Sequence, residues 1–149
     1  MSPLEFFTAA PGFLLRSVLL GLFAAGLAWH LNKCLGRLPG ATPARLAPLV
    51  EEAAKTVPAA LFAADIFSVH FVFGLAEGAW EFGSGRRNGF YAGLWAVVTH
   101  SVFGFITVFV LQTCGSLAPA LAAACLSHAV WNHVVFRYLK TAPKTGAEE

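Results

Sequence analysis

Residues 89–111 read GFYAGLWAVVTHSVFGFITVFVL, an apolar run that contains no Asp, Glu, Lys or Arg. A helix needs roughly 20 such residues to cross the hydrocarbon core of a bilayer, and this run reaches that length. The whole chain has the same character, because 57% of its 149 residues are hydrophobic, only 12% are charged and the mean hydropathy is +0.66. A soluble domain carries about 25% charged residues and could not bury so much apolar surface, whereas lipid accepts it. The sequence therefore predicts an all-α, polytopic transmembrane helical bundle.

Four further apolar segments accompany this run and bring the expected number of helices to about five. We expect these helices to cover approximately Gly12–Leu31, Ala47–Phe67, Ser68–Phe82, Gly89–Leu111 and Leu117–Leu139. The third is short and acidic, so the other helices must shield it from lipid. A polar turn at residues 83–88 separates the third helix from the fourth, while the boundary near Asp65 is the least marked. We expect one integral-membrane domain over residues 1–140, with a motif-bearing core at 47–139 and a disordered cytoplasmic tail at 141–149.

Basic residues indicate how the bundle is oriented. Eight of the ten Lys and Arg fall at helix ends that share one side of a five-span bundle: Lys33, Arg37, Arg45, Arg86, Arg87, Arg137, Lys140 and Lys144. Cytoplasmic loops carry the excess of Lys and Arg, so we expect an outward N-terminus and a cytoplasmic C-terminus in the cell membrane. The first apolar segment has no positive charge before it and contains Arg16, which favours a retained helix over a cleaved signal peptide.

Charge and cysteine content argue against several other classes. A formal net charge of +2 and the absence of mixed basic and aromatic runs disfavour nucleic-acid binding. Cys34, Cys114 and Cys125 are odd in number and irregularly spaced, so we expect free thiols rather than a disulfide framework or a zinc motif.

Ionisable side chains occur inside the expected spans, where they are costly and by default mark function. They are Glu51, Glu52, Lys55, His70, Glu77, Glu81, His100, His128 and His133. Glu51 and Glu52 are adjacent and point about 100° apart on a helix, so one can face a cavity and the other a neighbouring helix. Lys55 follows Glu51 by four residues, and we expect an ion pair between them.

One face of the third helix carries His70, Gly74, Glu77 and Glu81. Their spacing of i, i+4, i+7 and i+11 makes this face continuous, so it must meet protein or water. We expect Glu81 to pair with the basic turn that follows the helix, and His70 to lie at the outer interface. Glu77 lies deeper and is the candidate for a functional role.

The fourth and fifth helices carry centrally placed histidines. His100 is followed one turn later by Gly104, which permits close helix approach at a buried histidine. His128 and Asn132 share a face, where the amide can hold the imidazole or donate to a developing oxyanion. His133 points elsewhere and is expected to be structural. Because each would otherwise face lipid or pack without a partner, we expect one cavity to be lined by Glu51, Glu52, Glu77, His100, His128 and Asn132.

Four segments together resemble the PrsW family of membrane proteases. Residues 51–55, EEAAK, resemble its EExxK motif, and residues 73–77, FGLAE, resemble an aromatic-and-glycine motif that ends in Glu. His100 followed by a glycine resembles the third motif, and residues 128–132, HAVWN, resemble the fourth, HxxxN. The resemblance covers roughly residues 51–136, and the wider superfamily includes CAAX prenyl proteases and bacteriocin-immunity-type membrane proteins.

This resemblance implies an intramembrane endopeptidase of glutamate type, which hydrolyses peptide bonds of membrane-associated substrates with a Glu/His-activated water. The catalytic residues that it implies are Glu51, Glu52, His100 and His128, supported by Lys55, Glu77 and Asn132. One of the two glutamates would act as general base, and the histidines would orient the water or stabilise the oxyanion. Lys55 would tune the basicity of the glutamate, Glu77 would fix the tautomer of a histidine, and Asn132 would assist. The partner would be a membrane protein or membrane peptide, such as an anti-sigma factor or a signal-like peptide.

Other chemistries and functions stay open as alternatives. The chain has no Gly-x-Ser-x-Gly elbow and no aspartyl pair, which disfavours serine and aspartyl proteolysis. No cofactor is expected; two histidines and a glutamate could hold zinc with an open position, but the HExxH spacing is absent. The alternatives are a non-catalytic binding or immunity-type protein of the same fold, a small Glu/His ion or proton transporter, and a haem bundle with His100 and His128 as axial ligands.

Overall fold

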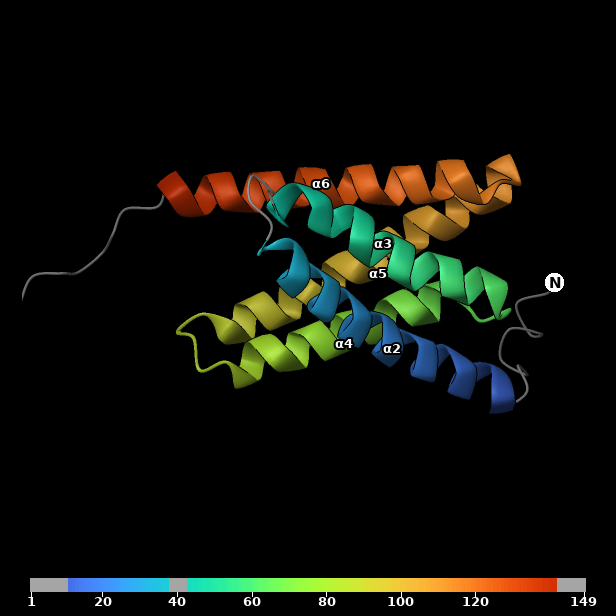
Figure 1. Ribbon diagram of the computed structural model, residues 1–149, viewed down its shortest axis with the longest axis horizontal. Coiled ribbons are helices and arrows are strands. Elements are labelled where there is room, and N and C mark those ends of the chain that lie inside the picture. Colours follow the sequence, from blue (N-terminus) through green and yellow to red (C-terminus); the bar gives the residue numbers. More distant parts are fainter. Residues whose placement is uncertain (1–10, 38–42, 142–149) are drawn as a thin grey trace, which may run out of the picture.

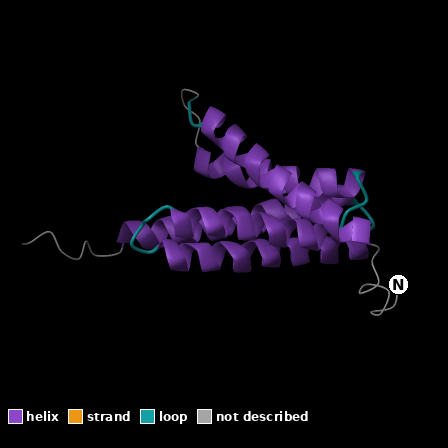
Figure 2. Ribbon diagram, turned by 90° about the horizontal axis from the view of Figure 1, so that it is seen from below, coloured by secondary structure: helices purple, strands orange, loops and turns teal. Residues whose placement is uncertain are grey.

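A computed structural model describes residues 11–37 and 43–141, and the regular structure of those residues is entirely helical. The five helices are α2 (Pro11–Leu35), α3 (Pro43–Leu61), α4 (Ile66–Gly83), α5 (Gly89–Cys114) and α6 (Leu117–Thr141). Figures 1 and 2 show these helices joined by loops, with no strand in the part of the chain described. The prediction of an all-α chain with about five helices is confirmed, whereas the predicted tail beyond Thr141 lies outside the described residues.

The turn between α3 and α4 departs most from the expected helix boundaries. The second helix does not continue to Phe67, because the chain turns before that residue and begins α4. Ala63 adopts a left-handed conformation, with φ 48°, which ends the preceding helical path. Asp65 then accepts a hydrogen bond from the Ser68 backbone N–H at 2.7 Å and caps the first turn of α4. The boundary that the sequence marked least is therefore built by a local capping interaction.

α4 is in contact with three of the four other helices. It packs against α2, α3 and α5, while α6 packs against α3 and α5. Where α4 crosses α5, a Cβ atom on Gly78 would lie only 2.8 Å from the carbonyl oxygen of Gly93. Glycine is needed there because any side chain would hold the two backbones further apart. The shortest helix is thus covered by three neighbours, as its acidic sequence requires.

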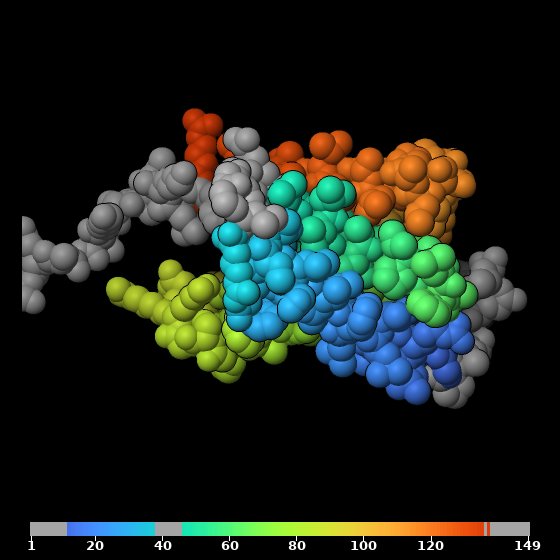
Figure 3. Space-filling model, in the orientation of Figure 1, coloured from blue at the N-terminus to red at the C-terminus, as the bar shows by residue number. Residues whose placement is uncertain are grey.

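The helices spread apart toward one end of the molecule. Figure 2 shows α2 and α3 inclined to the other three helices, and Figure 3 shows α2 and α3 side by side across one face. The C-terminal ends of α2, α4 and α6 all lie at this end (Figure 1). The groove described below lies toward this end, between α2 and α4.

Large apolar side chains remain exposed along the outside of the helices. Those more than half exposed include Leu22, Phe23, Leu94, Phe105 and Phe109. By length and composition, two segments are able to cross a membrane, Gly12–Leu35 and Gly89–Cys114.

Candidate functional site

Five polar side chains are buried together at the centre of the bundle. They are Glu52, Lys55, His70, His100 and His128, and none is more than a tenth exposed. We call this set the polar core. α3 contributes its acid and its ammonium group, while α4, α5 and α6 contribute one imidazole each. The polar core exists only because four helices bring these side chains together.

Glu52, rather than Glu51, is the ion-pair partner of Lys55. The Nζ atom of Lys55 lies 2.6 Å from Oε1 of Glu52, and both side chains are fully buried. The expected pair at i, i+4 is therefore wrong, and the pair forms at i, i+3 instead. The reason is tertiary: the inward face of α3 carries Glu52 and Lys55, while Glu51 is turned toward α2 and accepts a hydrogen bond from the Asn32 amide at 2.9 Å.

Lys55 also determines the tautomer of His100. Its Nζ atom lies 2.9 Å from Nδ1 of His100, and an ammonium group can only donate, so Nδ1 must accept. The proton of the neutral imidazole then resides on Nε2, which lies 2.5 Å from Oε2 of Glu77. Glu77 therefore contacts a histidine, as the sequence predicts. Both ring nitrogens of His100 are occupied, so this side chain bridges Lys55 and Glu77.

His128 is oriented by the same glutamate that binds Lys55. Its Nδ1 atom lies 2.9 Å from Oε1 of Glu52, and because an ionised carboxylate only accepts, Nδ1 carries the proton. Nε2 is left as an acceptor and faces Oε2 of Glu51 at 3.7 Å. Of the two roles open to Asn132, it does not hold the imidazole, because its side chain makes no hydrogen bond with the described residues. Charge-assisted bonds to carboxylates are stronger than a bond to an amide, which explains the preference.

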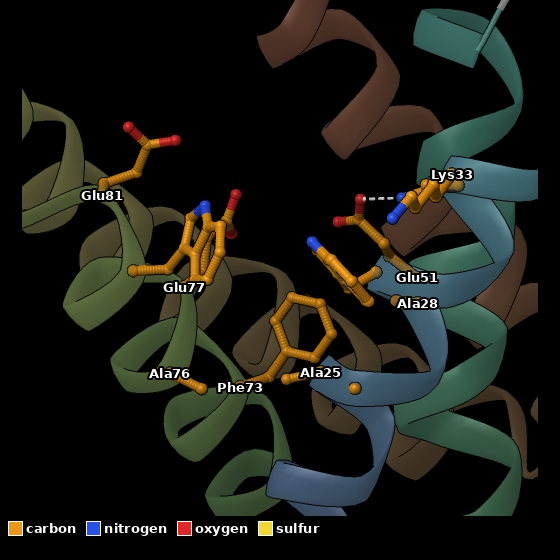
Figure 4. Close-up of a pocket in the computed structure, with 12 residues that line it drawn as sticks. Ala25, Ala28, Lys33, Glu51, Phe73, Ala76, Glu77 and Glu81 are labelled. Atoms are coloured by element: carbon orange, nitrogen blue, oxygen red, sulfur yellow. Dashed lines mark hydrogen bonds between the residues drawn. The ribbon is translucent and has the colours of Figure 1, made fainter. Parts of the chain in front are cut away.

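A groove of about 760 Å³ opens between α2 and α4 beside the polar core. Its wall is formed by Ala25, Gly26, Ala28, Trp29, Asn32, Lys33, Glu51, Phe73, Ala76, Glu77, Trp80 and Glu81. Figure 4 shows the carboxylates of Glu51 and Glu77 on opposite sides of this groove, with the Phe73 ring between them. Two of the six residues expected to share one cavity, Glu51 and Glu77, line this groove. Glu52, His100 and His128 are buried behind them, with the His100 and His128 ring centroids 5.4 Å apart.

His70 is the largest correction to the sequence-based site. It was expected at the outer interface, yet its side chain is fully buried, 3.6 Å from Oε2 of Glu52. Gly104 makes room for it, since a Cβ atom on that glycine would lie 2.7 Å from Cβ of His70. Gly104, one turn after His100, therefore makes room for His70 rather than for His100. The spacing of His70 and Glu77 on one helix face was the signal that both point inward.

Three further residues, Glu81, His133 and Asn32, lie outside the polar core. Glu81 pairs with Arg86 at 3.2 Å, as expected, and His133 is exposed, as expected for a residue off the functional face. Asn32 lies one residue beyond the expected end of the first helix at Leu31, but the structure places it in the last turn of α2, because that helix continues to Leu35. Sequence spacing contained no signal that an amide from α2 would reach a glutamate of α3.

The polar core contains a possible set of metal ligands, but Lys55 opposes metal binding. One ligand atom each from Glu52, His100 and His128 lie within 4.8 Å of one another. Oε1 of Glu52 and Nδ1 of His100 both contact the Lys55 ammonium group, so a zinc ion bound to these atoms would have to displace a buried cation. A haem iron fits no better, because His100 has both ring nitrogens occupied and His128 turns both toward carboxylates.

The geometry defines the class of site as a buried carboxylate–imidazole network beside an open groove. No protein-family model, curated protein or solved structure matches this chain. What the site can do therefore follows from its own contacts. All four motif segments of the sequence contribute at least one side chain to this one location.

Proposed function

We propose that the protein is an intramembrane endopeptidase of the PrsW type, crossing the cell membrane five times. Two helices of sufficient length and apolarity and the exposed leucines and phenylalanines support the membrane setting. The C-terminal end of α2, the turn between α4 and α5, and the C-terminal end of α6 lie at one end of the molecule (Figure 1). Most basic residues belong to these segments, which supports an outward N-terminus and a cytoplasmic C-terminus. The groove would then open near the cytoplasmic side.

One observation carries the proposal of hydrolysis. Oε2 of Glu51 and Nε2 of His128 face each other at 3.7 Å, close to the wall of the groove, without bonding directly. A water molecule beside them can donate a hydrogen bond to each, since both atoms are acceptors. Glu51 would take a proton from that water while the water oxygen adds to a peptide carbonyl carbon. The proton would then pass to the amine as the carbon–nitrogen bond breaks, releasing an acid and an amine.

The two adjacent glutamates would have different tasks. Glu51 is partly exposed to the groove, so it can meet water and substrate. Glu52 is fully buried and engaged by Lys55 and His128, so it would hold the imidazole in the required tautomer. A buried carboxylate orients the histidine of a Ser–His–Asp triad in the same manner. The general base is therefore Glu51, and Glu52 is its positioning neighbour.

The opposite side of the groove would support the substrate. Glu77 is held by His100 and remains 42% exposed, so one of its oxygens can meet an incoming peptide. Trp29, Trp80 and Phe73 supply apolar walls, and the volume lies within the range of small-ligand pockets. An extended segment of a membrane protein or membrane peptide fits this combination. Asn132 remains the proposed donor to the oxyanion.

The contacts favour hydrolysis over ion or proton transport. A chain of contacts runs from Glu51 through His128, Glu52, Lys55 and His100 to Glu77. Both of its ends line the same groove, as expected for groups that act together on one bound substrate.

The test is cleavage of a tagged membrane substrate by the full chain reconstituted in liposomes. Glu51→Gln keeps the shape and the hydrogen bond from Asn32 but cannot take a proton, so we expect turnover to fall about 10²- to 10⁴-fold with folding unchanged. His133→Ala is the matched control, because His133 is exposed on α6, and it should retain full activity. Unchanged cleavage by Glu51→Gln would refute the glutamate mechanism. Substrate binding without any cleavage by the wild type would favour the non-catalytic alternative.

A further inference from the structure

Two buried polar atoms face each other without a hydrogen bond of standard length. They are Oε2 of Glu52 and Nδ1 of His70, which lie 3.6 Å apart and have no other partner. Both side chains are fully buried. An unsatisfied buried polar atom is destabilising, so natural structures rarely keep one without a reason. The mechanism proposed above uses the other oxygen of Glu52 and makes no use of His70.

The two neighbours of the His70 ring, Thr56 and Glu52, indicate which ring nitrogen carries the proton. Nε2 of His70 lies 3.1 Å from Oγ1 of Thr56, which is also fully buried. A neutral imidazole has one donor and one acceptor nitrogen. The carboxylate of Glu52 can only accept, so the proton belongs on Nδ1. The Thr56 hydroxyl then donates to Nε2.

From these contacts we propose that Thr56 and His70 form a relay behind Glu52 that fixes the rotation of its carboxylate, making His70 a positioning residue. The relay runs from the Thr56 hydroxyl to Nε2 of His70, and from Nδ1 of His70 to Oε2 of Glu52. A proton on Nδ1 directs a positive dipole at Oε2 across the 3.6 Å gap. This attraction favours the carboxylate rotation that directs Oε1 at His128 and Lys55. This inference rests on the proposed function, in which Glu52 orients the imidazole of His128.

The packing around His70 keeps the ring in this orientation. Gly104 of α5 lies against the base of the side chain, and a Cβ atom there would reach 3.1 Å from Cγ of the ring. The preceding residue in the helix, Val69, is fully buried as well. The absence of a side chain at Gly104 therefore leaves room for the His70 ring between α4 and α5.

Two amide substitutions separate the positioning role from simple packing. An Asn side chain places its amide near the position of Nδ1, whereas a Gln side chain places it near Nε2. His70→Asn can therefore still donate to Glu52, and His70→Gln leaves Oε2 without a donor. We expect kcat for the substrate to fall on the order of 10- to 100-fold in His70→Gln with KM unchanged, and His70→Asn to recover most of that loss. Thr56→Val, which removes the hydroxyl at equal volume, should lower kcat, and Thr56→Ser should restore it.

The outcomes of the kinetic test are distinct. Equal activity losses in His70→Asn and His70→Gln, together with equal losses of thermal stability, would show that His70 only fills space and would overturn the relay. Full activity in both variants would overturn it too. His133→Asn, at an exposed histidine of α6, controls for the substitution itself.

A second measurement does not depend on hydrolysis. Nitrogen-15 histidine NMR of the full chain in lipid nanodiscs, assigned with His70→Asn, should show His70 neutral with its proton on Nδ1. Thr56→Val should shift that signal. A proton on Nε2 would overturn the relay even if the enzyme cleaves its substrate. If the wild type cleaves nothing and the proton is on Nδ1, the proposed function fails while the arrangement of Thr56, His70 and Glu52 stands.

Discussion

Two ion pairs of this protein each join a glutamate to a basic side chain, but in opposite surroundings. Glu52 and Lys55 lie 2.6 Å apart with both side chains fully buried, whereas Glu81 and Arg86 lie 3.2 Å apart with Arg86 72% exposed. Exposed pairs contribute little because water and salt screen them. A buried pair is different, since removing one partner leaves an uncompensated charge away from water. Burial, rather than charge or spacing along the chain, therefore decides how much each pair contributes to the stability of the protein.

The largest effect is expected from Lys55→Met, which removes the ammonium at similar length. Glu52 would be left buried with two histidines and no cation, so we expect a loss of about 3–5 kcal/mol in the free energy of unfolding. Reversible unfolding in mixed micelles with a rising detergent fraction measures this. The double variant Lys55→Met/Glu52→Gln removes the orphaned charge and should recover much of the stability. A double variant no more stable than Lys55→Met would mean that the pair is not the source of the effect.

A smaller loss of stability is expected when Gly104, which lies against His70 of the polar core, is replaced by alanine. Gly104→Ala would bring a Cβ atom to 2.7 Å from Cβ of His70, so α4 and α5 must move apart. Overpacking of this kind typically costs about 1–3 kcal/mol. Gly26→Ala is the matched control in α2, because nothing lies within 4 Å of its added Cβ atom. That control should be neutral or stabilise the helix by up to about 1 kcal/mol, and the same unfolding measurement compares the two. Equal effects of the two substitutions would contradict the close contact.

The smallest effect is expected at the surface pair. Arg86→Met removes the partner of Glu81 but leaves that carboxylate near water, so stability should change by less than about 1 kcal/mol. Raising the salt concentration should reduce even this difference, because exposed charges are screened. A loss comparable to that of Lys55→Met would show that the exposed pair is not screened as its position implies.

The sequence predicted much of the site because helix periodicity determines which residues share a face. Glu51 and Glu52 do point to different surroundings, and Glu77 does reach a histidine, as their spacing indicated. Helix periodicity could not predict whether Lys55 pairs with Glu51 or with Glu52, since positions three and four residues apart lie on nearly the same face. Which of the two glutamates turns inward depends on the rotation of α3 against its neighbours.

His70 and Asn32 are two residues whose place in the site the sequence did not predict. His70 was expected at the outer interface, yet it lies on the face of α4 that packs against the other helices and is fully buried. Asn32 became part of the site because α2 extends to Leu35 and leans across α3. Neither helix length nor helix tilt is encoded in the spacing of polar residues.

By itself, the sequence determined the number and approximate span of the helices, since long apolar runs broken by Gly, Pro and charged turns allow little else. It also determined which residue types the site would contain, because ionisable groups inside apolar helices must find partners. Only the tertiary structure decided the partners themselves: Lys55 with Glu52 and His100, His128 with Glu52, and His70 behind them all. The physical reason is that a side chain's direction is set locally by its helix, whereas its neighbours depend on how four helices are rotated and brought together by glycines at their crossings.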